Sequence, residues 1–294
     1  MRKVPDVIGI EDMYKRVHRF QRRYIIFGIS VISLIIIVLG LTFLNNSGLF
    51  GTFRKQLNDL NCQVMYLDMN NGYGIFLECE GRTALFDSGN EAHTEEIIRF
   101  LEENEVEKLE YYFVLDATEE YKSVYETILN SVEIQSVILP ADKSENGMTE
   151  YFDELAFMNG RTATVLNMGR SFNVHKMHID VVDPCSPSSF EIRFGNNSFI
   201  IWNSDDESVE TEFVESLYLN EDKTYVLWLG KRAGEVKIIQ EKLTPQICIV
   251  DSENVNYDVS FMEQYSEEIY VTNNGEKIVV SSNEVDLKVK CENQ

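Results

Sequence analysis

The residues of this chain that could do chemistry are mostly carboxylates. Asp87, Glu119 and Asp205, together with one histidine, could hold Mg²⁺ or Mn²⁺, because carboxylate oxygens suit these cations. A catalytic zinc ion needs three good ligands and an open position for water. His175 and His178 are three residues apart beside a predicted strand and should point to opposite faces, so we expect ordinary surface or core histidines. The histidines beyond the N-terminal segment are His93, His175 and His178.

The elements that must position these residues alternate regularly along the chain. Apolar periodicity predicts strands at 63–69, 74–79, 82–86, 110–115, 136–139, 164–166, 178–182, 191–194, 198–202, 225–229, 248–250, 268–272, 277–281 and 286–290. It predicts helices at 92–103, 121–132, 149–157, 209–217, 236–242 and 260–265. Two runs of strands, each followed by helices, predict an α/β protein in which two sheets pack face to face with helices outside, an αββα sandwich.

Several segments, taken in order, resemble a known family. VMYLDMNNGYGIFLECEGRTALFDSGN (64–90) is similar to the start of ComEC-type metallo-β-lactamase domains, the outer hydrolase part of bacterial DNA-uptake channels. The LDM and LFDSG segments stand where the family has LDVGQGD-like and LIDGG-like motifs, although NNGY (70–73) replaces the GQGD-like element. FIIWNSD (199–205) looks like the FLLTGD strand, and LGKRAG (229–234) looks like the GHHGS turn. The resemblance covers about 62–290 and implies a metallo-β-lactamase-like αββα fold.

The same resemblance implies a dinuclear zinc site, but its ligand positions carry other residue types. The HxHxDH loop falls on four residues after the strand at 110–115. The bridging Asp of the TGD strand falls on a serine, and the His pair of the GHHGS turn falls on two cations. The degenerate positions are Ala117, Glu119, Tyr121, Lys122, Ser204, Lys231 and Arg232. We therefore predict no catalytic residue and no bound metal, with Zn²⁺ or Mn²⁺/Mg²⁺ as the alternative.

The cations at these positions allow two interpretations. Lys122, Lys231 and Arg232 could pair with Glu119 and Asp205, replacing the charge of the lost metal and forming a salt-bridged plug. Alternatively, Lys231 and Arg232 could bind an anion on the turn at 230–234.

An apolar segment near the N-terminus predicts a membrane anchor. YIIFGISVISLIIIVLGLTFL (24–44) holds 21 residues without a charge, and about 20 are needed to cross a bilayer in a helix. A buried core helix and a cleaved signal peptide are the alternatives, but a signal peptide would be shorter and would end in small residues. Basic residues are concentrated before the segment, which places the N-terminus in the cytoplasm. We predict a cytoplasmic basic tail at 1–23, a transmembrane helix at 24–44, a linker at 45–60 and an extracytoplasmic domain at 61–294.

Charge and cysteine content constrain the partners and the compartment. The net charge of −23 makes nucleic acid an unlikely partner, because such a field repels a phosphate backbone. Cys62 and Cys79 flank a predicted hairpin and could form a disulfide, while Cys248 reads as a buried core residue. The five cysteines, Cys62, Cys79, Cys185, Cys248 and Cys291, contain no C-x-x-C pair and leave at least one thiol.

Three classes of function follow from these observations. The first is a membrane-anchored, non-catalytic pseudoenzyme that binds or scaffolds an extracytoplasmic protein, a wall polymer or a second copy of itself. The second is a divergent metal-dependent hydrolase or phosphodiesterase, and the third is a solute sensor that signals through the anchor.

Overall fold

The structure is a computed structural model, and the residues that it describes belong to one compact unit, Leu60–Gln294. The described residues are 62–68, 73–87, 94–141, 148–185, 188–217, 223–231, 233–234, 236–252, 254, 257–272 and 276–293. Within these ranges no helix is long and apolar enough to cross a membrane. The predicted tail, anchor and linker lie outside the described residues, as do His93 and Arg232.

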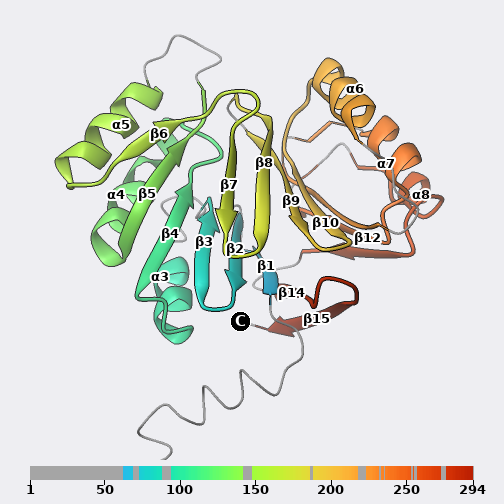
Figure 1. Ribbon diagram of the computed structural model, residues 1–294, viewed down its shortest axis with the longest axis horizontal. Coiled ribbons are helices and arrows are strands. Elements are labelled where there is room, and N and C mark those ends of the chain that lie inside the picture. The colour runs from blue at the N-terminus through green and yellow to red at the C-terminus, as the bar shows by residue number, and fades with distance from the viewer. Residues whose placement is uncertain are drawn as a thin grey trace, which may run out of the picture. The chain divides into compact units, whose positions relative to one another are not determined.

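The first sheet has eight strands in the order β15-β14-β1-β2-β3-β4-β5-β6 (Figure 1). Its parallel part runs from β3 to β6, and the other neighbours are antiparallel. The strands are β1 (Cys62–Asp68), β2 (Tyr73–Cys79), β3 (Arg82–Phe86), β4 (Lys108–Phe113), β5 (Glu133–Leu139), β6 (Ala163–Val165), β14 (Glu276–Ser282) and β15 (Leu287–Asn293).

The second sheet has seven strands in the order β13-β12-β11-β10-β9-β8-β7. Strands β10 to β13 are parallel, and β7 to β10 are antiparallel. The strands are β7 (Ser171–Val174), β8 (Met177–Asp183), β9 (Ser189–Phe194), β10 (Asn197–Trp202), β11 (Thr224–Leu229), β12 (Ile247–Val250) and β13 (Glu268–Val271).

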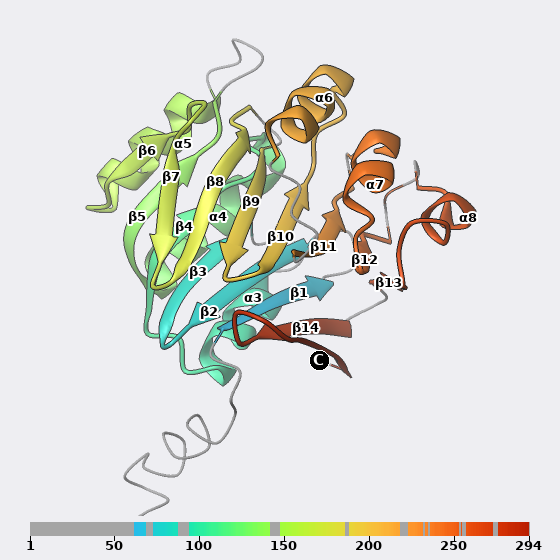
Figure 2. The ribbon, with the colours of Figure 1, turned by 45° about the vertical axis from the view of Figure 1, so that its right-hand side comes forward.

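Helices cover the outer face of each sheet, as Figure 2 shows from the side. The first sheet buries its outer apolar side chains under α3 (Thr94–Glu103), α4 (Lys122–Ser131) and α5 (Met148–Met158), with the short η2 (Glu119–Tyr121) before α4. The second sheet does the same under α6 (Glu207–Ser216), α7 (Lys237–Leu243) and α8 (Val259–Met262). The predicted αββα sandwich is therefore confirmed for the described residues.

The core between the two sheets is built from alternate residues of facing strands. Phe86 and Phe113 stack with ring centroids 4.3 Å apart, and Phe190 of the second sheet meets Phe86 edge-on at 5.4 Å. All three rings are fully buried. Burying one such side chain stabilises the fold by about 1.5–3 kcal/mol, so this interface holds the sheets together.

Most of the predicted elements are present, and the differences are local. The prediction missed β7, a four-residue strand that joins β8 through the turn at His175 and Lys176. His175 therefore lies in the turn between β7 and β8, with a φ of 52°. Strand β4 begins and ends two residues earlier than predicted. Val114 and Leu115 are buried in the loop that follows the strand, so their apolar side chains had the pattern of a longer strand.

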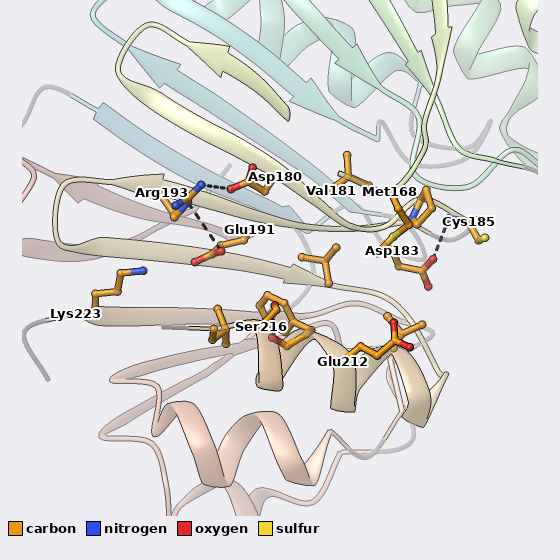
Figure 3. A pocket seen from close by; sticks show the side chains of 15 residues that line it. Met168, Asp180, Val181, Asp183, Cys185, Glu191, Arg193, Glu212, Ser216 and Lys223 are labelled. Carbon is orange, nitrogen blue, oxygen red and sulfur yellow. Dashed lines mark hydrogen bonds and ion pairs between the residues drawn. The ribbon is translucent and has the colours of Figure 1, made fainter. Parts of the chain in front are cut away.

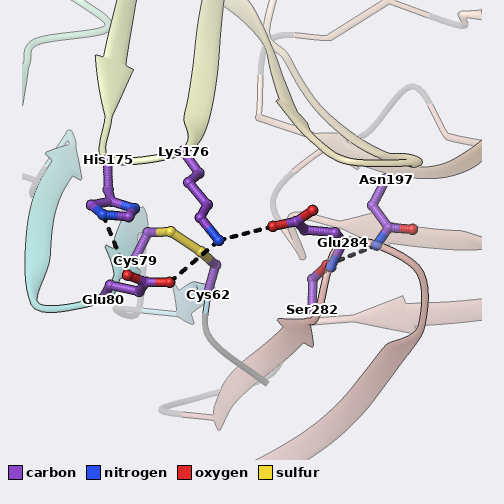
Figure 4. Close-up of a disulfide and its surroundings, with 8 residues drawn as sticks. All are labelled: Cys62, Cys79, Glu80, His175, Lys176, Asn197, Ser282 and Glu284. Carbon is purple, nitrogen blue, oxygen red and sulfur yellow. Dashed lines mark hydrogen bonds and ion pairs between the residues drawn. A yellow bond between two sulfur atoms is a disulfide. The ribbon is translucent and has the colours of Figure 1, made fainter. Parts of the chain in front are cut away.

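One end of the sandwich is closed by a disulfide and a group of ion pairs (Figure 4). Cys62 and Cys79 are directly opposite each other on β1 and β2 and are bonded, as the predicted hairpin suggested. The Lys176 ammonium lies 3.6 Å from Glu80 and 3.1 Å from Glu284, so it joins turns of both sheets. The other three cysteines, Cys185, Cys248 and Cys291, are thiols.

Candidate functional site

The candidate site lies where several strands of both sheets end. Asp87 directly follows β3 and Asp251 directly follows β12, while two residues separate Asp116 from the end of β4. These three side chains are between 2% and 6% exposed. The carboxyl ends of parallel strands share one edge of a sheet, so each sheet brings its carboxylates to the same edge.

Tyr73 links the two sheets close to these carboxylates. Its hydroxyl accepts a hydrogen bond from Asn203 Nδ2 at 2.5 Å, and its ring lies 4.6 Å from that of Trp228. Burial raises the pKa of the Tyr73 hydroxyl well above its usual range, and four nearby acidic groups raise it further: Asp87, Tyr121, Asp116 and Asp251. The centre of the site is therefore a neutral phenol that spans both sheets.

Hydrogen bonds also hold the loop that follows β10. Ser204, at the position of the bridging Asp, donates from Oγ to Asp183 Oδ2 at 2.8 Å. Asp183 Oδ1 accepts from the backbone N–H of Cys185 at 3.0 Å, and Ser189 Oγ accepts from the backbone N–H of Asn203 at 3.0 Å. Ser204 and Asp183 are 1% and 2% exposed. A buried hydrogen bond between a serine hydroxyl and a carboxylate thus fixes this loop.

The turn that resembles the GHHGS motif packs tightly against this loop. A Cβ at Gly230 would stand 2.4 Å from Asn203 Oδ1, which is too close for any real contact. The Gly230 carbonyl accepts from Asn254 Nδ2 at 2.8 Å, and Asn254 is 1% exposed. The close approach explains why a glycine stands at the start of this turn.

The cations and acids predicted at the site are at its periphery. Lys122 and Glu119 form a pair at 3.7 Å, and the Lys122 ammonium lies 4.3 Å over the ring of Tyr151 on α5. Hydrogen bonding to Tyr151, more than the charge of Glu119, raises the pKa of Lys122. Asp205 and Lys231 are exposed. The buried acids of the site are thus not Glu119 and Asp205 but the aspartates around Tyr73 and Ser204.

Two further residues of the resemblance, Ala117 and Tyr121, serve the fold. Ala117 is buried in the apolar cluster between the first sheet and its helices. Tyr121 closes η2 and packs against that cluster, close enough to Tyr73 to influence its hydroxyl.

The described side chains do not supply the ligands of a metallo-β-lactamase centre. In the part of the chain that the structure describes, no three His, Cys, Asp or Glu residues are grouped so that they could hold one metal ion. His175 pairs with Glu80 at 3.3 Å, and His178 pairs with Asp180 at 3.1 Å, both at the surface. A dinuclear zinc centre therefore does not fit this site.

A cavity of about 690 Å³ lies elsewhere, between α6 and strands β8 and β9 (Figure 3). Asp180 and Glu191 line it and both form ion pairs with Arg193. Phe213 of α6 contributes to its apolar side. A smaller cavity of about 330 Å³ beside the site includes Ser204, Asp205 and Glu210. Both volumes are of the order of a small-ligand site, about 300–1,000 Å³.

Four residues belong to the site although the sequence pattern does not single them out: Tyr73, Asn203, Asp183 and Asp251. Asp251 had a recognisable signal, since it directly follows an apolar strand, as Asp87 does. Tyr73 had none, because a tyrosine at the start of a strand is ordinary.

Comparison with known proteins defines the fold. No protein-family model matches the chain, and no curated protein matches it significantly in sequence. The metallo-β-lactamase fold protein YhfI from Bacillus subtilis superposes with a TM-score of 0.50 at 10% identity, over 74% of this chain and 98% of that chain. This chain therefore has the metallo-β-lactamase fold, and a fold by itself does not specify an activity.

Weaker similarities to two other solved structures carry no further argument. A diphosphatase of the PhnP family has a TM-score of 0.45 at 10% identity, covering 76% of this chain and 99% of that chain. A Cronobacter sakazakii metallo-β-lactamase mutated in its HARLDQ motif has a TM-score of 0.41 at 13% identity, covering 69% and 88%.

Proposed function

We propose that this protein is a membrane-anchored, non-catalytic metallo-β-lactamase-fold module, related to ComEC-type domains, that binds a partner outside the cell. The observation that carries the proposal is the buried Tyr73 hydroxyl, hydrogen-bonded by Asn203 among Asp87, Asp116 and Asp251. A neutral phenol linking both sheets gives the site a structural role that requires no cation. The binding surface would then lie elsewhere on the domain.

Two observations support the membrane and extracytoplasmic parts of the proposal. The uncharged segment at 24–44 has the length of a bilayer span, with its basic residues on the N-terminal side. The Cys62–Cys79 disulfide is typical of oxidising compartments and rare in the cytosol.

Metal analysis tests the non-catalytic assignment. The full chain, purified in detergent without chelator, is dialysed, analysed for metal and titrated with Zn²⁺, Mn²⁺ and Mg²⁺ while its thermal unfolding is followed. We expect no retained metal and no shift in Tm. Retention of near-stoichiometric metal would contradict the non-catalytic assignment.

The runner-up is a divergent metal-dependent hydrolase acting on a phosphodiester. It would rest on Asp87 and Asp116, which are buried beyond the ends of neighbouring parallel strands of the first sheet, because Mg²⁺ can be bound by one or two carboxylates together with substrate phosphates. Metal retention in the assay above, followed by metal-dependent cleavage of a phosphodiester substrate, would establish it.

Thiol labelling tests the orientation. Cys291 is exposed, so a membrane-impermeant maleimide, added to intact cells after a membrane-impermeant reductant, should label it, and the label should be lost in Cys291→Ser. Labelling that requires cell lysis would place the domain in the cytoplasm.

A further inference from the structure

Strand β15 has one edge without a strand neighbour in the part of the chain that the structure describes. It is the last strand of the eight-stranded sheet and pairs only with β14, along its whole length (Figure 1). A seven-residue edge presents a row of backbone donors and acceptors, which is a template for another strand. Lysines on such an edge discourage most pairings but not all of them.

The side chains of β15 alternate between the two faces of the sheet. Leu287 and Val289 pack against the core between the sheets, and Cys291 stands opposite buried Ile278 in the same row. Lys288, Lys290 and Glu292 form the other row. Lys290 pairs with Glu292, and Lys277 of β14 lies 2.9 Å from Glu292.

The order of charges selects one register for pairing with a second copy. When two copies of β15 pair antiparallel about a two-fold axis perpendicular to the sheet, directly opposite residues point to the same face of the sheet. Each possible register therefore places one residue on the axis, opposite its own copy, and that residue identifies the register. With Cys291 on the axis, Lys290 faces Glu292 twice and no like charges meet. With Lys290 on the axis two lysines meet, and with Val289 on the axis Lys288 meets Lys290 twice. Opposite charges directly across a sheet stabilise it and like charges destabilise it.

We propose that β15 is the interface with a second copy of this chain, pairing antiparallel about Cys291. Residues directly opposite in an antiparallel pair have Cα atoms about 4.5–5.5 Å apart, which lies within the range of about 4.4–6.8 Å for disulfides. The register selected by charge therefore brings two exposed Cys291 thiols within bonding distance. This goes beyond the proposed function, because the pairing holds whether or not the site binds metal.

Disulfide trapping tests the interface. The full chain in detergent is incubated with oxidised glutathione, which takes up the two thiol protons and two electrons and yields two molecules of reduced glutathione per interchain bond. On non-reducing electrophoresis we expect a covalent dimer that Cys291→Ser abolishes and Cys185→Ser retains. Absence of the dimer, while Cys291 still reacts with maleimide, would overturn the proposal.

A matched control separates pairing from random collision. Val285 is 62% exposed in the turn between β14 and β15, so Val285→Cys with Cys291→Ser moves the thiol a short way off the strand. We expect its dimer to form several-fold more slowly. Equal rates would show that contact is collisional and would count against the interface.

Charge variants test the register. Glu292→Lys places like charges opposite each other and should lower the dimer yield several-fold, and adding Lys290→Glu should restore it. Thermal unfolding of each variant shows that it is folded, since Glu292 also pairs with Lys277 in its own chain. A folded Glu292→Lys variant that dimerises as well as the parent overturns the register. These results are independent of metal binding, so either proposal can fail alone.

Discussion

At the scale of single residues, the site depends on hydrogen bonds and ring packing around Tyr73. A tyrosine is already neutral near pH 7, and burial raises the pKa of the Tyr73 hydroxyl further above its usual range. A neutral phenol can both accept and donate a hydrogen bond, and Asn203 supplies the donor to it. The site therefore stabilises the sandwich through hydrogen bonds and ring packing.

Replacing Tyr73 with Phe should remove one buried hydrogen bond and leave Asn203 without this acceptor. We expect a loss of about 1–3 kcal/mol in the free energy of unfolding, measured by urea denaturation. Tyr265→Phe is the control, since the hydroxyl of Tyr265 makes an exposed hydrogen bond to Glu241 that is long, at 3.5 Å, and therefore weak. Equal effects of the two substitutions would contradict a special role for Tyr73.

Gly230→Ala should destabilise the protein because its Cβ would stand 2.4 Å from Asn203 Oδ1. The forced displacement should cost about 1–3 kcal/mol, measured in the same urea titration. Gly234→Ala is the matched control in the same turn, because its Cβ would come no closer than 3.6 Å to Asp205. If the control were as destabilising as Gly230→Ala, close packing against Asn203 would not be the reason for the glycine.

At the scale of elements, α6 and α7 are joined by a buried carboxylate. Glu210 of α6 is 6% exposed and accepts a hydrogen bond from the backbone N–H of Ile239, in the first turn of α7, at 2.9 Å. A carboxylate near the start of a helix is favourable because of the exposed N–H groups there. Burial still raises the pKa of Glu210, against the lowering effect of its backbone donors.

This raised pKa gives the contact a defined dependence on pH. As pH rises through the window between the ordinary pKa of a glutamate and the raised value in the fold, the unfolded chain releases its proton first. The contribution of Glu210 to the free energy of unfolding therefore falls as pH rises through this window, and it is constant at higher pH. Glu210→Gln keeps an acceptor for Ile239 and should remove this part of the slope, measured by urea unfolding at several pH values. Glu215→Gln, on the exposed side of α6, should leave the dependence of stability on pH unchanged. If Glu215→Gln changed this dependence and Glu210→Gln did not, Glu210 would not be its source.

At the scale of the whole molecule, the two sheets are held together by apolar packing supplemented by a few polar links. Buried Asn197 donates to Ser282 Oγ at 2.7 Å, joining β10 to β14. Exposed Lys176 makes ion pairs across the same end of the sandwich. Burial decides which link contributes more, because water screens the surface pairs.

Asn197→Ala should therefore cost more stability than Lys176→Met. We expect about 1–3 kcal/mol for the first, since it removes a buried hydrogen bond and leaves unfilled space at a residue that is 1% exposed, and at most about 1 kcal/mol for the second. Differential scanning calorimetry with urea unfolding at matched salt measures both. A larger effect of Lys176→Met would mean that the ion pairs hold this end of the sandwich.

Much of the fold could be predicted from local patterns. The hairpin of β1 and β2, its disulfide and the alternation of strands with helices follow from periodicity and from turn residues near in sequence. Strand β7 was missed because four residues give too little alternation to recognise. The residue types at the positions of the HxHxDH and GHHGS motifs could also be read from the sequence.

The sequence alone determined the alternation of elements, the missing ligands, the acidic charge and the uncharged segment at 24–44. Only the tertiary structure decided which acids are buried. Glu119 and Asp205 are far apart in sequence and were expected to share one site, yet both are exposed. Tyr73, Asn203 and Asp251 had to be brought together by two sheets before the phenol could be recognised at the centre. The physical reason is that burial and hydrogen bonding are set by residues distant in the chain, which no local pattern records.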